Sequence, residues 1–303
     1  MKVAVCAIGK WEEQYLPEWV EHYKNIGFDN ILFYDNNEIG NNEQYEVLKP
    51  YIDGGFVIYH DFREQQHLYA QKNAYKHSNK KYRCKYDYIA YFDVDEFLEL
   101  VEHKTIKEFL ISNENFIKFD GIIFNWKLVG DGGLIYNDYK PLKDRFSQSR
   151  IIDSKTFKSI VKNTCEYIIG DGIHSVHSPF FYNGKVFCTT SGEKISNEVR
   201  TKSREHCDDK AYIKHYRTKT IQETVVRAKR GYCNIGGYEE DLTDMNSRID
   251  LFLKQFCCIN RFTKEKLYVV IKEFPRFVYS EYYKKYIKLV ELNRIKRKYI
   301  SNV

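Results

Sequence analysis

Short apolar runs alternate with segments of helical periodicity along most of the chain. Such near-continuous apolar runs are typical of strands inside a parallel sheet. Strands are predicted at 2–9, 30–34, 56–59, 88–92, 121–126, 159–162, 185–188 and 213–216. Helices are predicted at 11–26, 64–77, 105–111 and 220–230, and from about residue 246 onward. This alternation predicts an α/β fold with a doubly wound sheet and right-handed crossovers.

The expected organisation is one α/β domain over residues 1–235 and a helical, basic extension over 236–303. A chain of 303 residues can bury a substantial core. The eight cysteines form no C-x-x-C pair and no signal peptide precedes them, so a cytoplasmic location with reduced thiols is expected. No apolar run approaches the ~20 residues of a membrane span.

Positive charge is concentrated at the C-terminus. The chain carries a net charge of +6, and residues 274–303 hold eight Lys or Arg against two Glu, which accounts for all of it. A nucleic-acid enzyme would spread positive charge over its main domain, so no nucleic-acid partner is expected.

Aromatic and aliphatic residues of this tail, beginning at Tyr279, Tyr282, Tyr283 and Tyr286, follow helical spacing with lysines elsewhere around the helix. Two interpretations stay open. The helix either packs on the main domain with a solvated basic face, or docks on an anionic membrane surface at the inner face of the cell membrane. In the second case each basic residue near the membrane surface contributes ~1 kcal/mol to the free energy of membrane binding.

Two carboxylates follow the apolar run 88–92 directly. Asp93 and Asp95 are two residues apart, so on an extended segment they point to the same side. Hard oxygen ligands favour Mg²⁺ or Mn²⁺, which keep open positions for substrate phosphates. A calcium loop is excluded, because Leu98 and Lys104 occupy the positions that require Gly and Glu. A solvated acidic turn is the remaining alternative.

Six segments, in order, resemble the family 2-like and family 92-like (DUF23-type) glycosyltransferases, which have the Rossmann-like GT-A fold. They are 10–19, 27–37, 71–75, 91–98, 126–133 and 215–231. The chain departs from the family at Trp11, where Asn is usual, and at Gly130, which lacks the usual preceding aromatic residue. The resemblance implies transfer of a hexose or HexNAc from a UDP-linked sugar to a glycan or lipid-linked glycan acceptor, with inversion, in surface polysaccharide biosynthesis.

The resemblance also assigns roles to individual residues. Those expected to contact the nucleotide-sugar donor are Ala7, Glu12, Asp35, Lys72, Asp93 and Lys219. A divalent cation, Mn²⁺ or Mg²⁺, is expected on Asp93, Asp95 and His215. Within the donor set, Asp35 would meet the uracil edge and Lys219 would lie near the diphosphate.

Structural alternatives to these roles stay open. Asp35 could form an ordinary Asx turn, and His215 could be a packed core histidine. His174 and His177, spaced H-x-x-H, could bring two imidazoles to one ion or contact the acceptor. Arg227 and Arg230, three apart on one helix face, suit phosphate contact and solvation equally.

The general base for inversion has two candidates, Asp131 and Asp171, each flanked by glycine. Gly-Asp-Gly is also a common turn. Two other functions are alternatives to sugar transfer. A nucleotidyltransferase would carry a glycine-rich basic loop after the first strand, where this chain has Glu12 and Glu13. A carbohydrate-binding module rests only on the 16% aromatic content.

Overall fold

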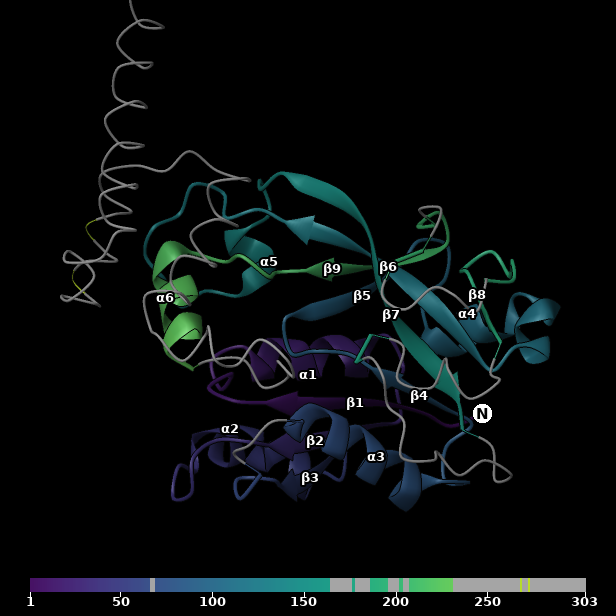
Figure 1. Ribbon diagram of the computed structural model, residues 1–303, viewed down its shortest axis with the longest axis horizontal. Coiled ribbons are helices and arrows are strands. Elements are labelled where there is room, and N and C mark those ends of the chain that lie inside the picture. The colour runs from purple at the N-terminus through teal and green to yellow at the C-terminus, as the bar shows by residue number, and fades with distance from the viewer. Residues whose placement is uncertain are drawn as a thin grey trace, which may run out of the picture. The chain divides into compact units, whose positions relative to one another are not determined.

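The computed structural model describes residues 1–65, 69–163, 176–177, 186–195, 202–203 and 207–230, together with Tyr268 and Lys272. Helices and strands follow one another as the hydrophobic pattern predicts (Figure 1). The first half contains β1 (Val3–Gly9), α1 (Leu16–Asn25), β2 (Asn30–Asp35), α2 (Glu43–Asp53), β3 (Val57–Asp61), α3 (Ala70–Tyr82), β4 (Tyr88–Tyr91), β5 (Glu96–Leu100) and α4 (Ile106–Ile111). The second half contains the 3₁₀ helix η1 (Glu114–Lys118), β6 (Gly121–Val129), α5 (Leu142–Arg145), β7 (Ile151–Lys162), β8 (Phe187–Cys188), β9 (Ala211–His215) and α6 (Ile221–Arg230).

These residues form two compact units. The first comprises residues 1–128 and 152–215, and the second comprises 129–151 and the described residues from Tyr216 onward. The sheet has the order β3-β2-β1-β4-β7-β6-β9-β5, and β8 pairs with β6. Strands β1 to β4 are parallel, whereas β7 runs antiparallel to β4 and β5 antiparallel to β9. The predicted Rossmann-like mixed sheet is therefore confirmed.

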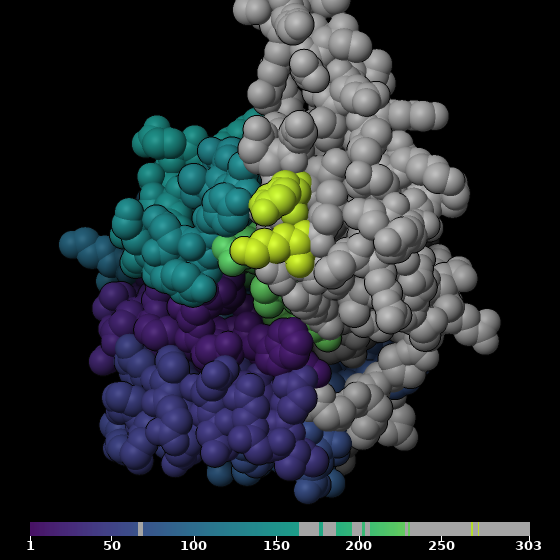
Figure 2. Space-filling view, turned by 90° about the vertical axis from the view of Figure 1, so that its left-hand side faces the viewer, coloured from purple at the N-terminus to yellow at the C-terminus, as the bar shows by residue number. Residues whose placement is uncertain are grey.

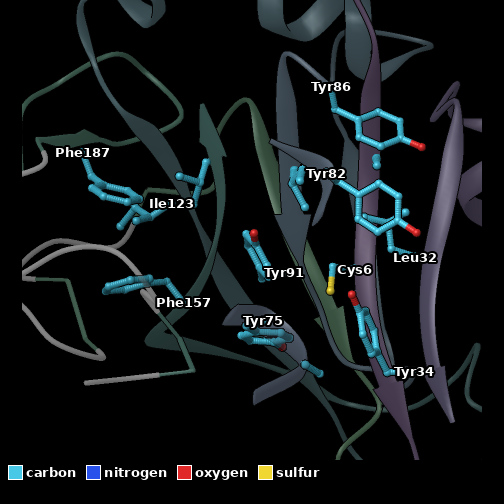
Figure 3. Close-up of a cluster of buried hydrophobic side chains, with 14 of the residues drawn as sticks. Cys6, Leu32, Tyr34, Tyr75, Tyr82, Tyr86, Tyr91, Ile123, Phe157 and Phe187 are labelled. Atoms are coloured by element: carbon cyan, nitrogen blue, oxygen red, sulfur yellow. The ribbon is translucent and has the colours of Figure 1, made fainter. Parts of the chain in front are cut away.

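Alternate residues of the parallel strands face two different helix layers. One face carries a cluster of buried side chains that includes Cys6, Tyr34, Tyr75 and Tyr91, with α3 packed on it (Figure 3). Helices α1 and α2 cover the other face, and their residues contribute to the continuous purple and blue surface of Figure 2. Burial on both sides explains why β1 reads as an unbroken apolar run.

The last residue of β1 must be glycine. A Cβ on Gly9 would lie 2.5 Å from Gln44 Oε1 and 2.7 Å from Phe33 Cζ. Those contacts are too short, so the close approach of α2 to the carboxyl end of β1 depends on the missing side chain.

Four of the described elements are absent from the sequence prediction, namely α2, β5, η1 and α5. Helix α2 was not predicted, because its periodicity is short and Pro50 lies inside its last turn. Strand β5 was also missed: the chain turns back at once after the acids, and Phe97 and Leu98 are buried in a new strand. The predicted helical extension 236–303 falls outside the described residues except for Tyr268 and Lys272, so the domain boundary stays a prediction.

One cysteine departs from the expected redox state. Cys84 is disulfide-bonded, whereas Cys6, Cys188 and Cys207 are free thiols. The expectation of reduced thiols throughout is therefore wrong at Cys84. In the described part of the chain, none of the helices combines the length and hydrophobicity that a membrane crossing requires. The predicted location and the predicted membrane contact of the tail both stay predictions.

The stability of the first unit is expected to depend on His60. Its Nε2 lies 2.7 Å from the Tyr82 hydroxyl and its ring stacks on Tyr34 at 4.5 Å. Burial, with smaller effects from Lys81 and His77, lowers the pKa of His60 from 6.5 to about 4. Between these values the unfolded chain binds a proton that the folded chain does not. The free energy of unfolding should therefore fall by roughly 3 kcal/mol as the pH drops from 6.5 to 4.

Urea titrations of the wild type and of His60→Phe at several pH values test this expectation. Phe can retain the stacking on Tyr34 but cannot titrate. The stability of the wild type relative to the variant should fall by roughly 3 kcal/mol between pH 6.5 and 4, and two parallel curves would contradict the assignment.

Candidate active site

The acidic motif forms a tight turn between β4 and β5. The Glu96 N–H donates to the Asp93 carbonyl at 3.0 Å, and the Asp93 N–H donates to Glu96 Oε2 at 2.9 Å. Two side chains of helix α1 hold the turn by hydrogen bonds to its backbone carbonyl oxygens. Trp19 Nε1 donates to both carbonyl oxygens, at 3.1 Å to Asp93 and 3.0 Å to Glu96, and the Tyr23 hydroxyl donates to the Glu96 carbonyl at 2.9 Å. The backbone that carries the carboxylates is therefore held by buried hydrogen bonds.

Asp93 is bound on one of its oxygens. Its Oδ1 lies 2.8 Å from Lys158 Nζ and accepts a hydrogen bond from Gln71 Nε2 at 2.7 Å. Burial alone would favour the neutral carboxyl, but the Lys158 ammonium holds the pKa of Asp93 below its ordinary value. Glu96 is fully buried, and burial raises its pKa well above the ordinary value. The surroundings of the turn therefore favour the charged form of Asp93 and the neutral form of Glu96.

Asp95 lies beside His215 at the end of β9. His215 Nε2 is 3.4 Å from Asp95 Oδ1, and both residues are buried. The sheet explains this pairing, because Glu96 is in register with His215 across the antiparallel strands β5 and β9. Trp126 covers the imidazole, with its ring centroid 4.3 Å from that of His215. His215 therefore lies at the acidic motif, and its role as a metal ligand stays a prediction.

His177 packs against the same tryptophan, Trp126. Its ring centroid is 5.2 Å from that of Trp126, and its Nδ1 is 3.2 Å from the Phe157 carbonyl oxygen. Burial and the nearby Lys158 lower its pKa to about 4. The neutral imidazole therefore packs against the site, while His174 lies outside the described residues.

The predicted metal ligands fit a divalent cation only in part. Within the described ranges, no three His, Cys, Asp or Glu side chains are grouped so that they could hold a metal ion. Asp95 and His215 lie together, whereas Asp93 contacts Lys158. Mg²⁺ and Mn²⁺ commonly take one or two protein ligands and complete their coordination with substrate phosphates and water. The two residues that lie together suit a cation bound in that way.

The predicted base-binding residues lie at the same edge of the sheet, because Asp35 is in register with Gly9 at the carboxyl ends of β2 and β1. Asp35 is fully buried. Its Oδ1 accepts from Gln44 Nε2 at 2.6 Å and from the Asn37 N–H at 2.9 Å, and its Oδ2 accepts from the Tyr59 hydroxyl at 2.7 Å. In this conformation Asp35 closes a turn, and its contact with uracil stays a prediction.

Other donor-binding candidates flank this edge. Ala7 is fully buried inside β1, Glu12 is buried at the start of the following loop, and Lys72 places its Nζ 4.9 Å from the centre of the Tyr69 ring. Trp11 adopts a left-handed backbone conformation with φ 54°. Asn tolerates that conformation better than most residues, which gives a physical reason for the Asn that the resemblance expects there.

The remaining candidates lie in the second unit. Asp131 is fully buried, and its Oδ1 accepts a hydrogen bond from the Gly133 N–H at 3.0 Å, so it closes a turn in the glycine-rich loop. Lys219 is buried with φ 51°. Arg227 donates to the Arg217 carbonyl at 2.9 Å. The roles of Asp131 and Lys219 stay predictions, and Asp171 lies outside the described residues.

Three residues that shape the site have no role in the sequence prediction: Lys158, Glu96 and Gln71. Lys158 carried a usable signal, since a lysine between Phe157 and Ile160 interrupts an apolar strand. Gln71 lies in the segment 71–75, which resembles the family, but the resemblance assigns it no function. Glu96 looked like one more surface acid, and only the turn geometry shows that it is buried.

The fold and the site together define a Rossmann-like α/β protein with an acidic turn at the carboxyl end of a central strand. The model of glycosyltransferase family 92 matches residues 1–249, so the chain belongs to that family.

Among the relatives, two Arabidopsis thaliana proteins, the galactan β-1,4-galactosyltransferases GALS3 and GALS2, are 25% and 24% identical over 205 residues. These matches cover 59% of this chain in each case, but only 40% and 38% of the relatives. Among solved structures, S. aureus TarS 1–349 is 12% identical at a TM-score of 0.39, covering 96% of this chain and 81% of that one.

Proposed function

We propose that this chain transfers a hexose from a UDP-linked sugar to a glycan acceptor with the help of a divalent cation. The observation that carries the proposal is the pairing of Asp95 with His215, 3.4 Å apart at the carboxyl end of the central strands, in a member of glycosyltransferase family 92. The names of the Arabidopsis relatives make UDP-galactose the first donor to test and β-1,4-galactan the first acceptor.

Asp95 and His215 would hold the cation, Mn²⁺ or Mg²⁺, with Asp93 beside them. When bound, such an ion neutralises negative charge that develops on the departing diphosphate, which is worth several kcal/mol. Trp126 packs against His215, and His177 packs against Trp126, so the imidazole of His215 is held by a buried aromatic contact. Trp19 and Tyr23 hold the turn rigid, so the carboxylates need little reorganisation during the reaction.

Inversion needs a carboxylate that accepts the proton of the acceptor hydroxyl. Asp131 and Asp171 are the proposed candidates, and the product would then be β-linked when the donor is α-linked. A role in surface polysaccharide synthesis and a lipid-linked acceptor belong to the same proposal.

A donor panel tests the function directly. The protein is incubated with UDP-galactose, UDP-glucose and their N-acetylhexosamine counterparts, with Mn²⁺ or with EDTA, and UDP release is measured. We expect release from one of these donors, loss of release with EDTA and recovery when Mn²⁺ is added back. The anomeric proton coupling of the product reports inversion or retention. No release from any donor would contradict the proposal, and release unaffected by EDTA would contradict its metal component.

A further inference from the structure

Lys158 is an ammonium buried inside the sheet. It lies in β7 next to Ser159, which pairs with Tyr91 of β4, so it reaches the start of the acidic turn. The residue is fully buried, as are its neighbours Phe157 and Ile160. Removing an ammonium from water costs several kcal/mol unless a partner compensates. An apolar side chain would suit this strand position better, so the lysine must be explained by its charge.

The partners of that charge are two acids of the turn. Lys158 Nζ is 2.8 Å from Asp93 Oδ1 and 3.7 Å from Glu96 Oε2. Burial alone would lower the pKa of the ammonium, but Asp93 and Glu96 raise it, so Lys158 is permanently charged. Asp93 is the nearer of the two acids, and Gln71 Nε2 donates a hydrogen bond of 2.7 Å to the same Asp93 oxygen.

We propose that Lys158 is a built-in counter-ion that competes with the divalent cation for Asp93 and leaves the cation to Asp95 and His215. This inference rests on the proposed function, since it concerns the cation of that site. Lys158 does not touch the substrate in this arrangement. It is a positioning residue that acts through Asp93.

The formal charges at the turn predict how Lys158 affects the binding of the cation and of the diphosphate. Asp93 and Asp95 each contribute −1 and Lys158 contributes +1, so these three side chains together have a formal charge of −1. A bound divalent cation brings it to +1, which attracts a diphosphate. Without Lys158 the empty turn would have a charge of −2 and the loaded turn would be neutral. Lys158 therefore weakens the binding of the cation and strengthens the binding of the diphosphate that follows.

The test compares Lys158→Met with the wild type in two titrations. In the first, Mn²⁺ alone is titrated and the free ion is counted by electron paramagnetic resonance. In the second, UDP is titrated by calorimetry at saturating Mn²⁺. We expect the variant to bind Mn²⁺ about tenfold more tightly and UDP about tenfold more weakly. Structural damage would weaken both, so opposite shifts identify the charge effect.

Three further variants provide controls. Lys162→Met removes a lysine from the same strand, where its Nζ lies 3.2 Å from the Ile117 carbonyl oxygen near the surface, and should change neither affinity. Asp93→Asn removes one negative charge and should weaken Mn²⁺ binding about tenfold, whereas Asp95→Asn should abolish it. In the double variant Lys158→Met with Asp93→Asn, the affinity for Mn²⁺ should return to the wild-type value.

The inference is overturned if Lys158→Met binds Mn²⁺ no more tightly than the wild type, or if Asp93→Asn alone abolishes binding. If Lys158→Met does not fold, Asp93→Asn still decides between the two outcomes. Mn²⁺ binding is measured without a sugar donor. The titration can therefore support or contradict the role of Lys158 even if the donor panel shows no hexosyl transfer.

Discussion

Asp95→Asn is expected to reduce hexosyl transfer about a thousandfold while the fold stays intact. The carboxylate is 6% exposed and lies 3.4 Å from His215, so the amide removes a charge from the centre of the proposed cation site with almost no change in shape. Loss of several kcal/mol of charge stabilisation corresponds to a rate loss of this size. The rate of UDP release at saturating donor measures it, and circular dichroism checks the fold.

Asp53→Asn is the matched control, because this aspartate is 63% exposed at the end of α2 and pairs with Lys49 in an i,i+4 contact. Its turnover should equal that of the wild type. A folded Asp95→Asn protein with near-normal turnover would remove the basis for placing the reaction at this turn.

Arg145→Met is expected to destabilise the second unit by about 3–5 kcal/mol. The Arg145 guanidinium forms two parallel hydrogen bonds of 2.9 Å with the carboxylate of Glu223, and the two side chains are 2% and 4% exposed. Glu223 also accepts bonds from the Thr220 N–H and hydroxyl at 3.0 and 2.6 Å, which fixes the start of α6. Removing the arginine leaves a buried carboxylate without its counter-charge. Hydrogen exchange in peptides spanning Ile221–Arg230 measures the loss.

Arg150→Met serves as the control, because Arg150 is exposed in the same unit and its loss should cost less than about 0.5 kcal/mol. Adding Glu223→Gln to Arg145→Met should restore part of the protection, because the uncompensated charge then disappears. Unchanged exchange in Arg145→Met would mean that the buried pair does not hold α6.

The parallel half of the fold was predictable because its strands are buried on both faces. Val3 to Ala7 and Ile31 to Tyr34 are all fully buried, and burial of every position gives the continuous apolar runs from which the strands were read. β5 could not be read in this way. Its first residue is Glu96, which looks like a surface acid in the sequence. In the structure its buried carboxyl group accepts a hydrogen bond from the Asp93 N–H and lies 3.7 Å from Lys158 Nζ, and these tertiary contacts leave no mark in the local sequence.

The candidate site also combines features that local sequence predicts with features that depend on tertiary contacts. Asp93 and Asp95 follow a strand end directly, so local sequence was enough to select them. Their different surroundings depend on which strands lie on either side: β7 brings Lys158 to one carboxylate, and β9 brings His215 to the other. Pairing between distant strands leaves no local pattern, so the sequence could not divide the motif into two different carboxylates.

The support that α1 gives to the acidic turn has a consequence for mutational screens. Trp19 and Tyr23 bind backbone carbonyl oxygens of that turn from the far side, although both are fully buried and belong to an ordinary amphipathic helix. A random library sorted for expressed but inactive protein should therefore return substitutions at these two positions alongside those at the carboxylates. Without this structure, such hits in α1 would be discarded as folding defects.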